Sequence, residues 1–313
     1  MPKAVSKQKI GVGFLALAVL TGAGMMWFIQ SGPGVWTDNI SNRNVSDTTA
    51  DLGLSRKTRA HAAGLLSAFH GLDALPRLSN VICRGSAGRT GMPVIFSTEI
   101  DIATMQAGDF QVTTRSGTTI TPYCASVLPA TDPGELRTVL LMGRLRPADS
   151  DPPVSVEVTG HLFSIDGTLD FRGASVPVIP LEDGPSIVLA EGVADWTRVG
   201  HLGPRRVRGS LCPTDGIVQA VRVVWEGGIT LEDGTEPSQA ERDFYTITVE
   251  AADGNRRVVR PAALANLGDG DNNHMLCMDT TDRPISVSVP EGVLTDPNDD
   301  LNPATSVAVA PPR

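Results

Sequence analysis

The residues with the clearest chemical potential are two groups of acidic and amide side chains near the C-terminal end. The first group contains Asp269, Asp271 and Asn273, with Asp279 a little further on. Ca²⁺ takes roughly six to eight oxygen ligands, many of them from Asp and Asn on a loop that bends around the ion. Residues two apart in an extended segment share a side, and the glycines that flank Asp269 let the backbone bend. We therefore predict a calcium site formed by these four side chains. A hydrated turn is the alternative, because turns prefer the same residue types.

The second group comprises Asp296, Asn298, Asp299, Asp300 and Asn302. Its opening, Asp296-Pro297-Asn298-Asp299, resembles the Asp-x-Asn-Asp linker of cadherin repeats, although Asp300 stands where that family has Asn. The resemblance is confined to this short stretch, and it implies a second calcium-binding loop. No further domain follows the stretch, so the role between domains that the family gives it is not expected. Neither group fits an EF-hand, because no Glu closes the loop at the required spacing.

Motifs of catalysis are absent from the sequence. It has no GxSxG nucleophile elbow, HExxH zinc motif, Walker loop or GxGxxG turn. The five histidines lack tight ligand spacing, and hydrogen-bonded structural roles are expected for His161 and His274. A pair of carboxylates for glycoside hydrolysis can come from anywhere in a chain, so a hydrolase stays an open alternative. The sequence favours a non-catalytic protein with no cofactor beyond the predicted calcium.

The cysteines predict two disulfide bonds. They are Cys83, Cys124, Cys212 and Cys277, and no CxxC occurs, so a zinc ribbon or thioredoxin-type site is not indicated. We predict the pairs Cys83–Cys124 and Cys212–Cys277, because folding units usually close their own bridges. Four buried free thiols are the alternative.

The N-terminal segment predicts the compartment. Lys3, Lys7 and Lys9 precede an uncharged run over residues 10–29, which is long enough to cross a bilayer core of about 30 Å. Positive residues next to a membrane segment stay in the cytoplasm, so residues 30–313 are predicted to be periplasmic or extracellular. A cleaved signal peptide followed by secretion is the alternative. Both readings place the cysteines where disulfides persist.

The remaining segments are assigned from composition and periodicity. Residues 1–9 form a basic cytoplasmic end, and residues 30–53 are polar and read as a flexible tether. A helix is predicted over 54–77, with helical spacing of apolar residues from Leu54 to Leu72. The expected order is then a first β-domain at 78–178, a linker at 179–204, a second β-domain at 205–294, and an acidic loop with a disordered tail at 295–313.

A faint internal duplication underlies the two domains. The stretch 109–162 and the stretch 243–294 carry the same landmarks in the same order. In each, a β-rich run is followed by a Pro (Pro122 or Pro261), an acidic loop, an apolar run and a Pro-led alternating run. The contents of 32 Gly and 23 Pro suit short strands joined by many turns. We predict a mainly β protein with two tandem antiparallel β-sandwich, Ig-like domains after an N-terminal membrane helix and one short helix.

Charge and composition narrow the function. The net charge of −9 supplies no basic stripe, which argues against nucleic-acid binding. The leading expectation is a membrane-anchored binding or adhesion module with a protein or carbohydrate partner. An envelope assembly component and a hydrolase on a β-scaffold are the alternatives. Exposed aromatic residues in a groove would favour a sugar ligand, and the candidates are Trp196, Trp225, Tyr123 and Tyr245. A cleft with two carboxylates of shifted pKa would favour the hydrolase.

Overall fold

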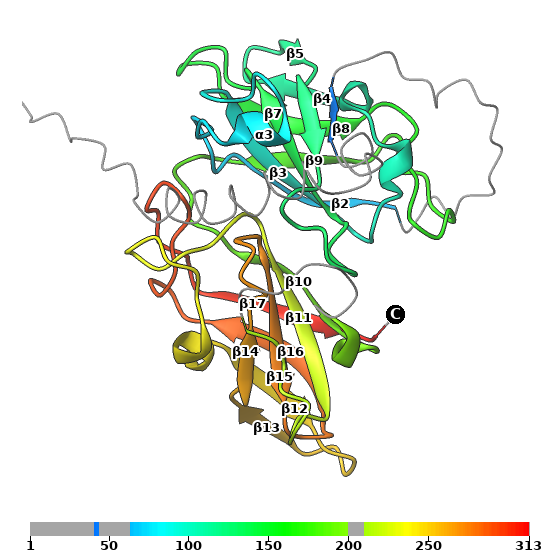
Figure 1. The fold of residues 1–313 in the computed structure, drawn as a ribbon, viewed down its shortest axis with the longest axis vertical. Helices are drawn as coiled ribbons and strands as arrows, with labels where there is room; N and C mark the ends of the chain where they lie inside the picture. The colour runs from blue at the N-terminus through cyan, green and yellow to red at the C-terminus, as the bar shows by residue number, and fades with distance from the viewer. Residues whose placement is uncertain (1–40, 44–62, 200–209, 313) are drawn as a thin grey trace, which may run out of the picture.

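The computed structural model of this protein describes residues 41–43, 63–199 and 210–312 (Figure 1). The protein is mainly β, with two curled sheets that each use one half of the chain. The predicted membrane segment at 10–29, the signal-peptide alternative and most of the predicted tether lie outside the described residues. Among the helices of the described ranges, none has the length and apolarity needed to cross a bilayer.

The first sheet, with its connections, is called the first unit. Its strands are β1 (Ser41–Arg43), β2 (Leu65–Phe69), β3 (Thr90–Phe96), β4 (Phe110–Thr114), β5 (Thr119–Ile120), β6 (Cys124–Ser126), β7 (Thr138–Gly143), β8 (Pro153–Val158) and β9 (Ser175–Ile179). The short helix α3 (Ser79–Ile82) and the 3-10 turns η1 (Ile102–Thr104) and η2 (Ala107–Asp109) lie in the connections. The hydrogen-bonded order of the strands is β1-β6-β7-β3-β2-β9-β8-β4-β5.

The second sheet, with its connections, is called the second unit. Its strands are β10 (Ile187–Gly192), β11 (Gln219–Trp225), β12 (Thr246–Glu250), β13 (Arg256–Val259), β14 (Ala263–Ala265), β15 (Asn273–Met278), β16 (Arg283–Val289) and β17 (Thr305–Ala310). Two 3-10 segments, η3 (Trp196–Arg198) and η4 (Gln239–Phe244), join them. The order of the strands is β13-β12-β16-β17-β10-β11-β15-β14.

The two sheets repeat one topology. Apart from β1, the order β6-β7-β3-β2-β9-β8-β4-β5 corresponds strand by strand to β14-β15-β11-β10-β17-β16-β12-β13. In each unit an early strand pairs in parallel with the last strand, as β2 with β9 and β10 with β17. The registers agree as well: Val112 lies opposite Val156, and Ile247 lies opposite Val287. The repeated landmarks of the sequence are thus matched by a repeated arrangement of strands.

Alternation of side chains explains why these segments form strands around a core. In β8, Val156 and Val158 are buried while Glu157 is exposed, as a period of two dictates. Equivalent positions carry an aromatic pair in both units. Phe96 and Phe110 meet edge to face at 6.3 Å, and Trp225 and Tyr245 do so at 6.4 Å. Each pair joins β3 or β11 to the opposite half of the same curled sheet, across the core.

Both predicted disulfide bonds are confirmed, as Cys83–Cys124 and Cys212–Cys277. Disulfides persist in oxidising compartments, so the two bonds indicate an extracytoplasmic location for this part of the chain. In each unit the first cysteine lies in the connection before the long central strand, β3 or β11.

The predicted helix is wrong where the structure describes it. Leu65–Phe69 forms β2, which pairs with β3 on one side and β9 on the other. Backbone partners on both sides favour an extended chain over a helix, whatever the spacing of apolar residues. Residues 54–62 lie outside the described residues.

Two further assignments are corrected by the second sheet. The predicted disordered tail contains β17, which lies between β16 and β10. The predicted linker contains β10, which is a central strand and not a connection. Val307 and Val309 on β17 pack against the core of the second unit, so the C-terminal segment completes that core.

Candidate functional site

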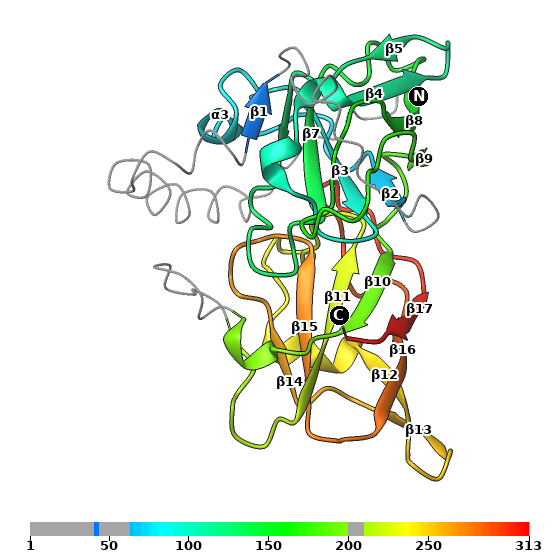
Figure 2. The same cartoon turned by 90° about the vertical axis from the view of Figure 1, so that its right-hand side faces the viewer.

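The contact between the two units, here called the joint, uses equivalent surfaces from each. Figure 2 shows β2 and β3 of the first unit next to β10 and β11 of the second. Phe69 on β2 and Glu191 on β10 occupy the same position, because each pairs with the parallel last strand of its unit. Phe69 reaches Gly227 of the second unit, where an added Cβ would lie 2.6 Å from its ring. Glu191 reaches Arg137 of the first unit.

One side of the joint is charged and buried. Arg137 Nη2 donates to Glu191 Oε1 at 2.7 Å, and their side chains are 3% and 8% exposed. Arg222 of the second unit lies with Nη1 3.7 Å from the same Glu191 oxygen, and its Nη2 donates to the carbonyl of Pro133 at 2.6 Å. Gly134 follows with φ +93°, and any Cβ there would overlap the Arg222 guanidinium. The close approach of the two units therefore requires glycine at position 134.

The acidic loops of both units converge beside these arginines. Asp132 and Glu135 precede β7, and Asp269 precedes the equivalent strand, β15. One carboxylate oxygen from each of the three residues lies within 4.8 Å of the other two. Glu135 is buried, accepts a hydrogen bond from the Asp132 backbone amide at 3.2 Å, and contacts the side chain of Asp271. We call these residues with Asp271 the carboxylate cluster.

Burial sets the electrostatics of the carboxylate cluster. It raises the pKa of Glu135 to about 8, against an opposing effect of Arg222. Burial, reinforced by the neighbouring acids, raises the pKa of Asp269 to about 9 and that of Asp271 well above its ordinary value. Glu236, close to Asp269, has its pKa raised by burial to about 7. Buried carboxylates at this density must take up protons or a cation near neutral pH.

The predicted calcium ligands are divided by the structure. Asp269 and Asp271 both belong to the carboxylate cluster. Asn273 donates to both oxygens of Asp271, from its backbone amide at 2.7 Å and from Nδ2 at 2.8 Å. Asp279 is exposed beyond the far end of β15, about 20 Å from Asn273 at 3.3 Å per residue. The four residues therefore do not form one group, and Asp132 and Glu135 of the first unit take the place next to Asp269.

The second acidic group forms a loop that satisfies its own backbone. Asp296 Oδ1 accepts from the amides of Asn298 and Asp300, at 2.8 and 3.0 Å. Asn302 Oδ1 accepts from the amides of Val293 and Leu294. Burial raises the pKa of Asp296 to about 6. The side-chain oxygens of Asp296 and Asn302 thus accept hydrogen bonds from backbone amides of the loop. They are therefore not free to act together as calcium ligands.

That loop also touches the other unit. Asn298 Nδ2 donates to the carbonyl of Gly71 in the first unit at 2.8 Å. The acidic loop thus contributes one more hydrogen bond to the joint.

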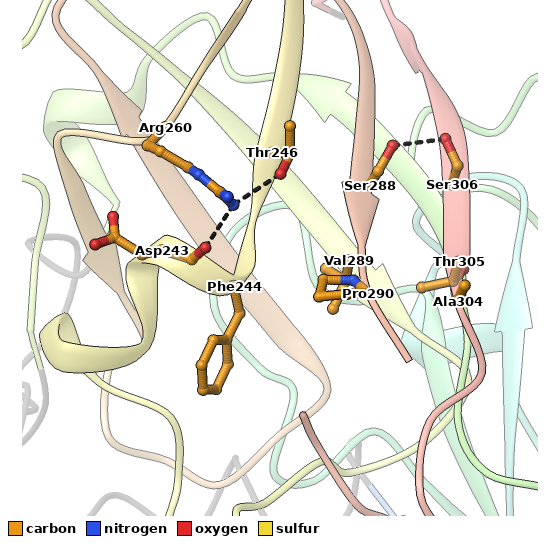
Figure 3. A pocket seen from close by; sticks show the side chains of 10 residues that line it. All are labelled: Asp243, Phe244, Thr246, Arg260, Ser288, Val289, Pro290, Ala304, Thr305 and Ser306. Atoms are coloured by element: carbon orange, nitrogen blue, oxygen red, sulfur yellow. Dashed lines mark hydrogen bonds between the residues drawn. The ribbon is translucent and has the colours of Figure 1, made fainter. Parts of the chain in front are cut away.

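An open pocket on the outer face of the second sheet is a separate candidate. It has a volume of about 490 Å³ and lies between the end of η4 and the facing ends of β16 and β17 (Figure 3). Phe244, Asp243 and Arg260 line one side, and Ser288 and Ser306 line the other. Phe244 is half-buried, so one part of its ring is available to a ligand.

The aromatic residues considered for sugar binding lie elsewhere. Trp225 and Tyr245 are fully buried in the core, and Tyr123 is covered by the Arg89 guanidinium at 4.4 Å. Trp196 packs half-buried against a small core beside the disulfide of the second unit. Phe244 was missed because a single Phe beside a strand looks like core from sequence alone. A comparison with known protein families and with characterised proteins gave no match.

Proposed function

We propose that this protein is a membrane-anchored, extracytoplasmic binding module without catalytic activity, in which calcium at the joint fixes the two β-units relative to each other. The observation that carries the proposal is the convergence of carboxylates from both units, Asp132 and Glu135 from the first and Asp269 from the second. Residues 10–29 supply the anchor, with cleavage and secretion as the alternative. Each curled sheet is taken as a variant of an antiparallel Ig-like sandwich, in which the parallel strand pair connects two facing halves.

The chemistry of the carboxylate cluster suits calcium. Carboxylate oxygens are the ligands this cation prefers, at about 2.3–2.6 Å, so two ligands on one ion are at most about 5 Å apart. The three oxygens of the carboxylate cluster satisfy this limit at 4.8 Å. Oδ1 of Asp269 is buried and accepts no hydrogen bond from the described residues, so a cation would supply the partner it lacks. Asp132, Glu135 and Asp269 are the proposed ligands, and Asp271 would adjust the charge beside them.

A fixed joint serves a displayed binding module. The Arg137–Glu191 ion pair and the Arg222 contacts are buried and directional, so they allow one orientation of the units. A cation that bridges loops from both units adds a further constraint of the same kind. A ligand surface on one unit is then held at a constant angle to the other unit.

The hydrolase alternative is disfavoured by burial. Glu135 and Asp271 have the raised pKa values expected of an acid pair, but they are only 2% and 6% exposed. A substrate must touch its catalytic carboxylates. The packing of the two units over this pair leaves a structural or ion-binding role as the better explanation.

Thermal unfolding of the full-length protein at pH 7.5, in calcium and in chelator, tests the proposal. Saturating calcium should raise the unfolding temperature by roughly 5 °C, because a ligand that binds only the folded state stabilises it. Asp269→Asn should abolish the shift. Asp253→Asn, which changes an exposed turn residue, should retain it. Equal unfolding temperatures of the unmodified protein in calcium and in chelator would reject calcium at the joint.

A further inference from the structure

A row of hydroxyl groups crosses three adjacent strands on the outer face of the second unit. Thr246 on β12 lies opposite Ser288 on β16, and Ser288 lies opposite Ser306 on β17. The Ser288 and Ser306 hydroxyls are 2.9 Å apart (Figure 3). These side chains alternate with the buried Ile247 and Val287, so they point away from the core.

The hydroxyl row ends at the open pocket, where apolar and charged groups meet. Phe244 lines the pocket from the end of η4, and Val289 and Pro290 line it from the end of β16. Arg260 is held in place, since its Nη1 donates to the Tyr245 carbonyl at 3.0 Å and to Thr246 Oγ1 at 2.7 Å. The carboxylate of Asp243 is largely exposed. Among the residues that the structure describes, Arg260 and Asp243 are the only charged ones that line the pocket, so its lining has no formal net charge.

The equivalent face of the first unit lacks this arrangement. By strand register, Gln111, Glu157 and Ser175 stand where the second unit has Thr246, Ser288 and Ser306. Asp109 stands in the place of Phe244 and is fully buried, where it accepts a hydrogen bond from the Gln106 amide. The shared fold does not require the hydroxyl row or the pocket, so both are specific to the second unit.

The three strands leave no backbone edge for an extended peptide. β12 pairs with β13 and β16, β16 pairs with β12 and β17, and β17 pairs with β16 and β10. Recognition by strand addition needs unpaired backbone donors and acceptors, which internal strands do not offer. A ligand on this face must be recognised through side-chain hydroxyls and the aromatic ring.

We propose that this face binds an uncharged oligosaccharide, an assignment that rests on the proposed binding function and names its ligand class. A sugar presents an apolar C–H face and a rim of hydroxyls. Phe244 offers an apolar surface to the first, while Ser288 and Ser306 offer hydrogen bonds to the second. A chain of sugars lies across β12, β16 and β17, with one residue in the pocket.

Calorimetric titration of the full-length protein with cellohexaose and with chitohexaose tests the proposal. At least one of them should bind with a dissociation constant of about 1 mM or tighter. Phe244→Ala should weaken binding roughly tenfold. Because Phe244 also packs on the core, the double variant Ser288→Ala/Ser306→Ala serves as a second probe and should weaken binding at least roughly threefold. Ser175→Ala, at the matching position of the first unit, should bind like the unmodified protein.

The results that would reject the oligosaccharide site differ from those that would reject calcium at the joint. No binding of either sugar, or equal binding by the pocket variants, rejects the oligosaccharide site. Binding of an extended uncharged decapeptide that Phe244→Ala removes also rejects it. Unfolding temperatures with and without calcium are recorded on the same samples. If calcium raises the unfolding temperature but neither sugar binds, only the proposal of an oligosaccharide site is rejected. If a sugar binds but calcium leaves the unfolding temperature unchanged, only the proposal of calcium at the joint is rejected.

Discussion

The two units share one plan of strands and differ in what stands at equivalent positions. In the first unit the aromatic pair Phe96–Phe110 is purely apolar. In the second, Trp225 Nε1 donates to Tyr245 Oη at 3.1 Å, and that hydroxyl is 2.6 Å from His274 Nδ1. The position of His274 is held by Val139 in the first unit. The backbone plan tolerates either an apolar core or one with internal hydrogen bonds, provided the volume is filled.

The two units also differ in how the equivalent strands β6 and β14 are covered. In the first unit β6 is covered by β1, which adds three residues of the predicted tether to the sheet. In the second unit the outward side of β14 is closed by side chains. Gln239 Oε1 accepts from the Leu264 amide, and Ser210 Oγ donates to the Leu264 carbonyl. Both arrangements occupy backbone groups of β6 and β14 that would otherwise be open to pairing with another chain.

Removing a disulfide from either unit is expected to have the largest effect on stability, and it tests whether the two units are equivalent. Cys124 lies opposite Met142, whereas Cys277 lies opposite Ala263, so the bonded cysteine has moved to the neighbouring strand at the same level of the sheet. Replacing either pair by Ala should cost about 4 kcal/mol, because the closed loops span 41 and 65 residues. The two losses should agree within about 1 kcal/mol in denaturant unfolding. A much larger loss for one pair would show that the two bonds are not equivalent.

The buried ion pair of the joint should have the next largest effect. Arg137→Met leaves Glu191 buried with Arg222 as a distant partner, and it should cost about 3 kcal/mol in the free energy of unfolding. Arg283→Met removes an exposed partner of Glu250 and is the matched control, with little expected change. Equal effects of the two substitutions would show that the joint does not depend on this pair.

Acid should destabilise the second unit through His274. Burial lowers the pKa of His274 to about 4, from an ordinary value near 6.5. The unfolded chain takes up a proton below about 6.5 while the folded chain does not, so stability is lost as pH falls from about 6.5 to about 4. The total is about 3 kcal/mol. His274→Gln keeps a polar group and does not titrate, so it should flatten this part of the profile. His70 in the first unit, whose pKa burial lowers similarly, remains in both proteins. An unchanged acid profile in His274→Gln would contradict the assignment.

The smallest effect is expected from the hydroxyl of Tyr245. Tyr245→Phe leaves Trp225 Nε1 and His274 Nδ1 without this partner in a buried site, at a cost of about 2 kcal/mol. The reciprocal change, Phe110→Tyr, places a hydroxyl in a core that lacks this network, so it should also destabilise. Denaturant midpoints measure both. A neutral Phe110→Tyr would mean that the first core already holds a partner for the hydroxyl.

The parts of the fold that local pattern determines could be predicted from the sequence. The strand runs around Val112, Val156 and Ile247 alternate with a period of two, and the cysteine pairs follow from the two-unit division. β2 and β17 were missed because their strand state depends on parallel neighbours that are distant in sequence. Val307 and Val309 alternate correctly, but Ala and Pro around them are equally typical of a loose terminus.

Only the residues that the second unit contributes to the candidate site could be predicted from the sequence. Asp269 and its neighbours form a run rich in Asp and Asn, whereas the loop that holds Asp132 and Glu135 carries only these two acidic side chains. Only the docking of the two units brings these residues together. A site shared between units needs their relative placement, and no periodicity within either unit encodes that placement.

The parallel pairing of β2 with β9 and of β10 with β17 has a mechanical consequence. A force that pulls the two ends of either unit apart enters near one strand of such a pair and leaves near the other. Because the two strands run side by side in the same direction, the pull slides them past each other. Their hydrogen bonds then resist together and do not open one at a time. Each unit is thereby suited to transmit tension along the chain while it stays folded.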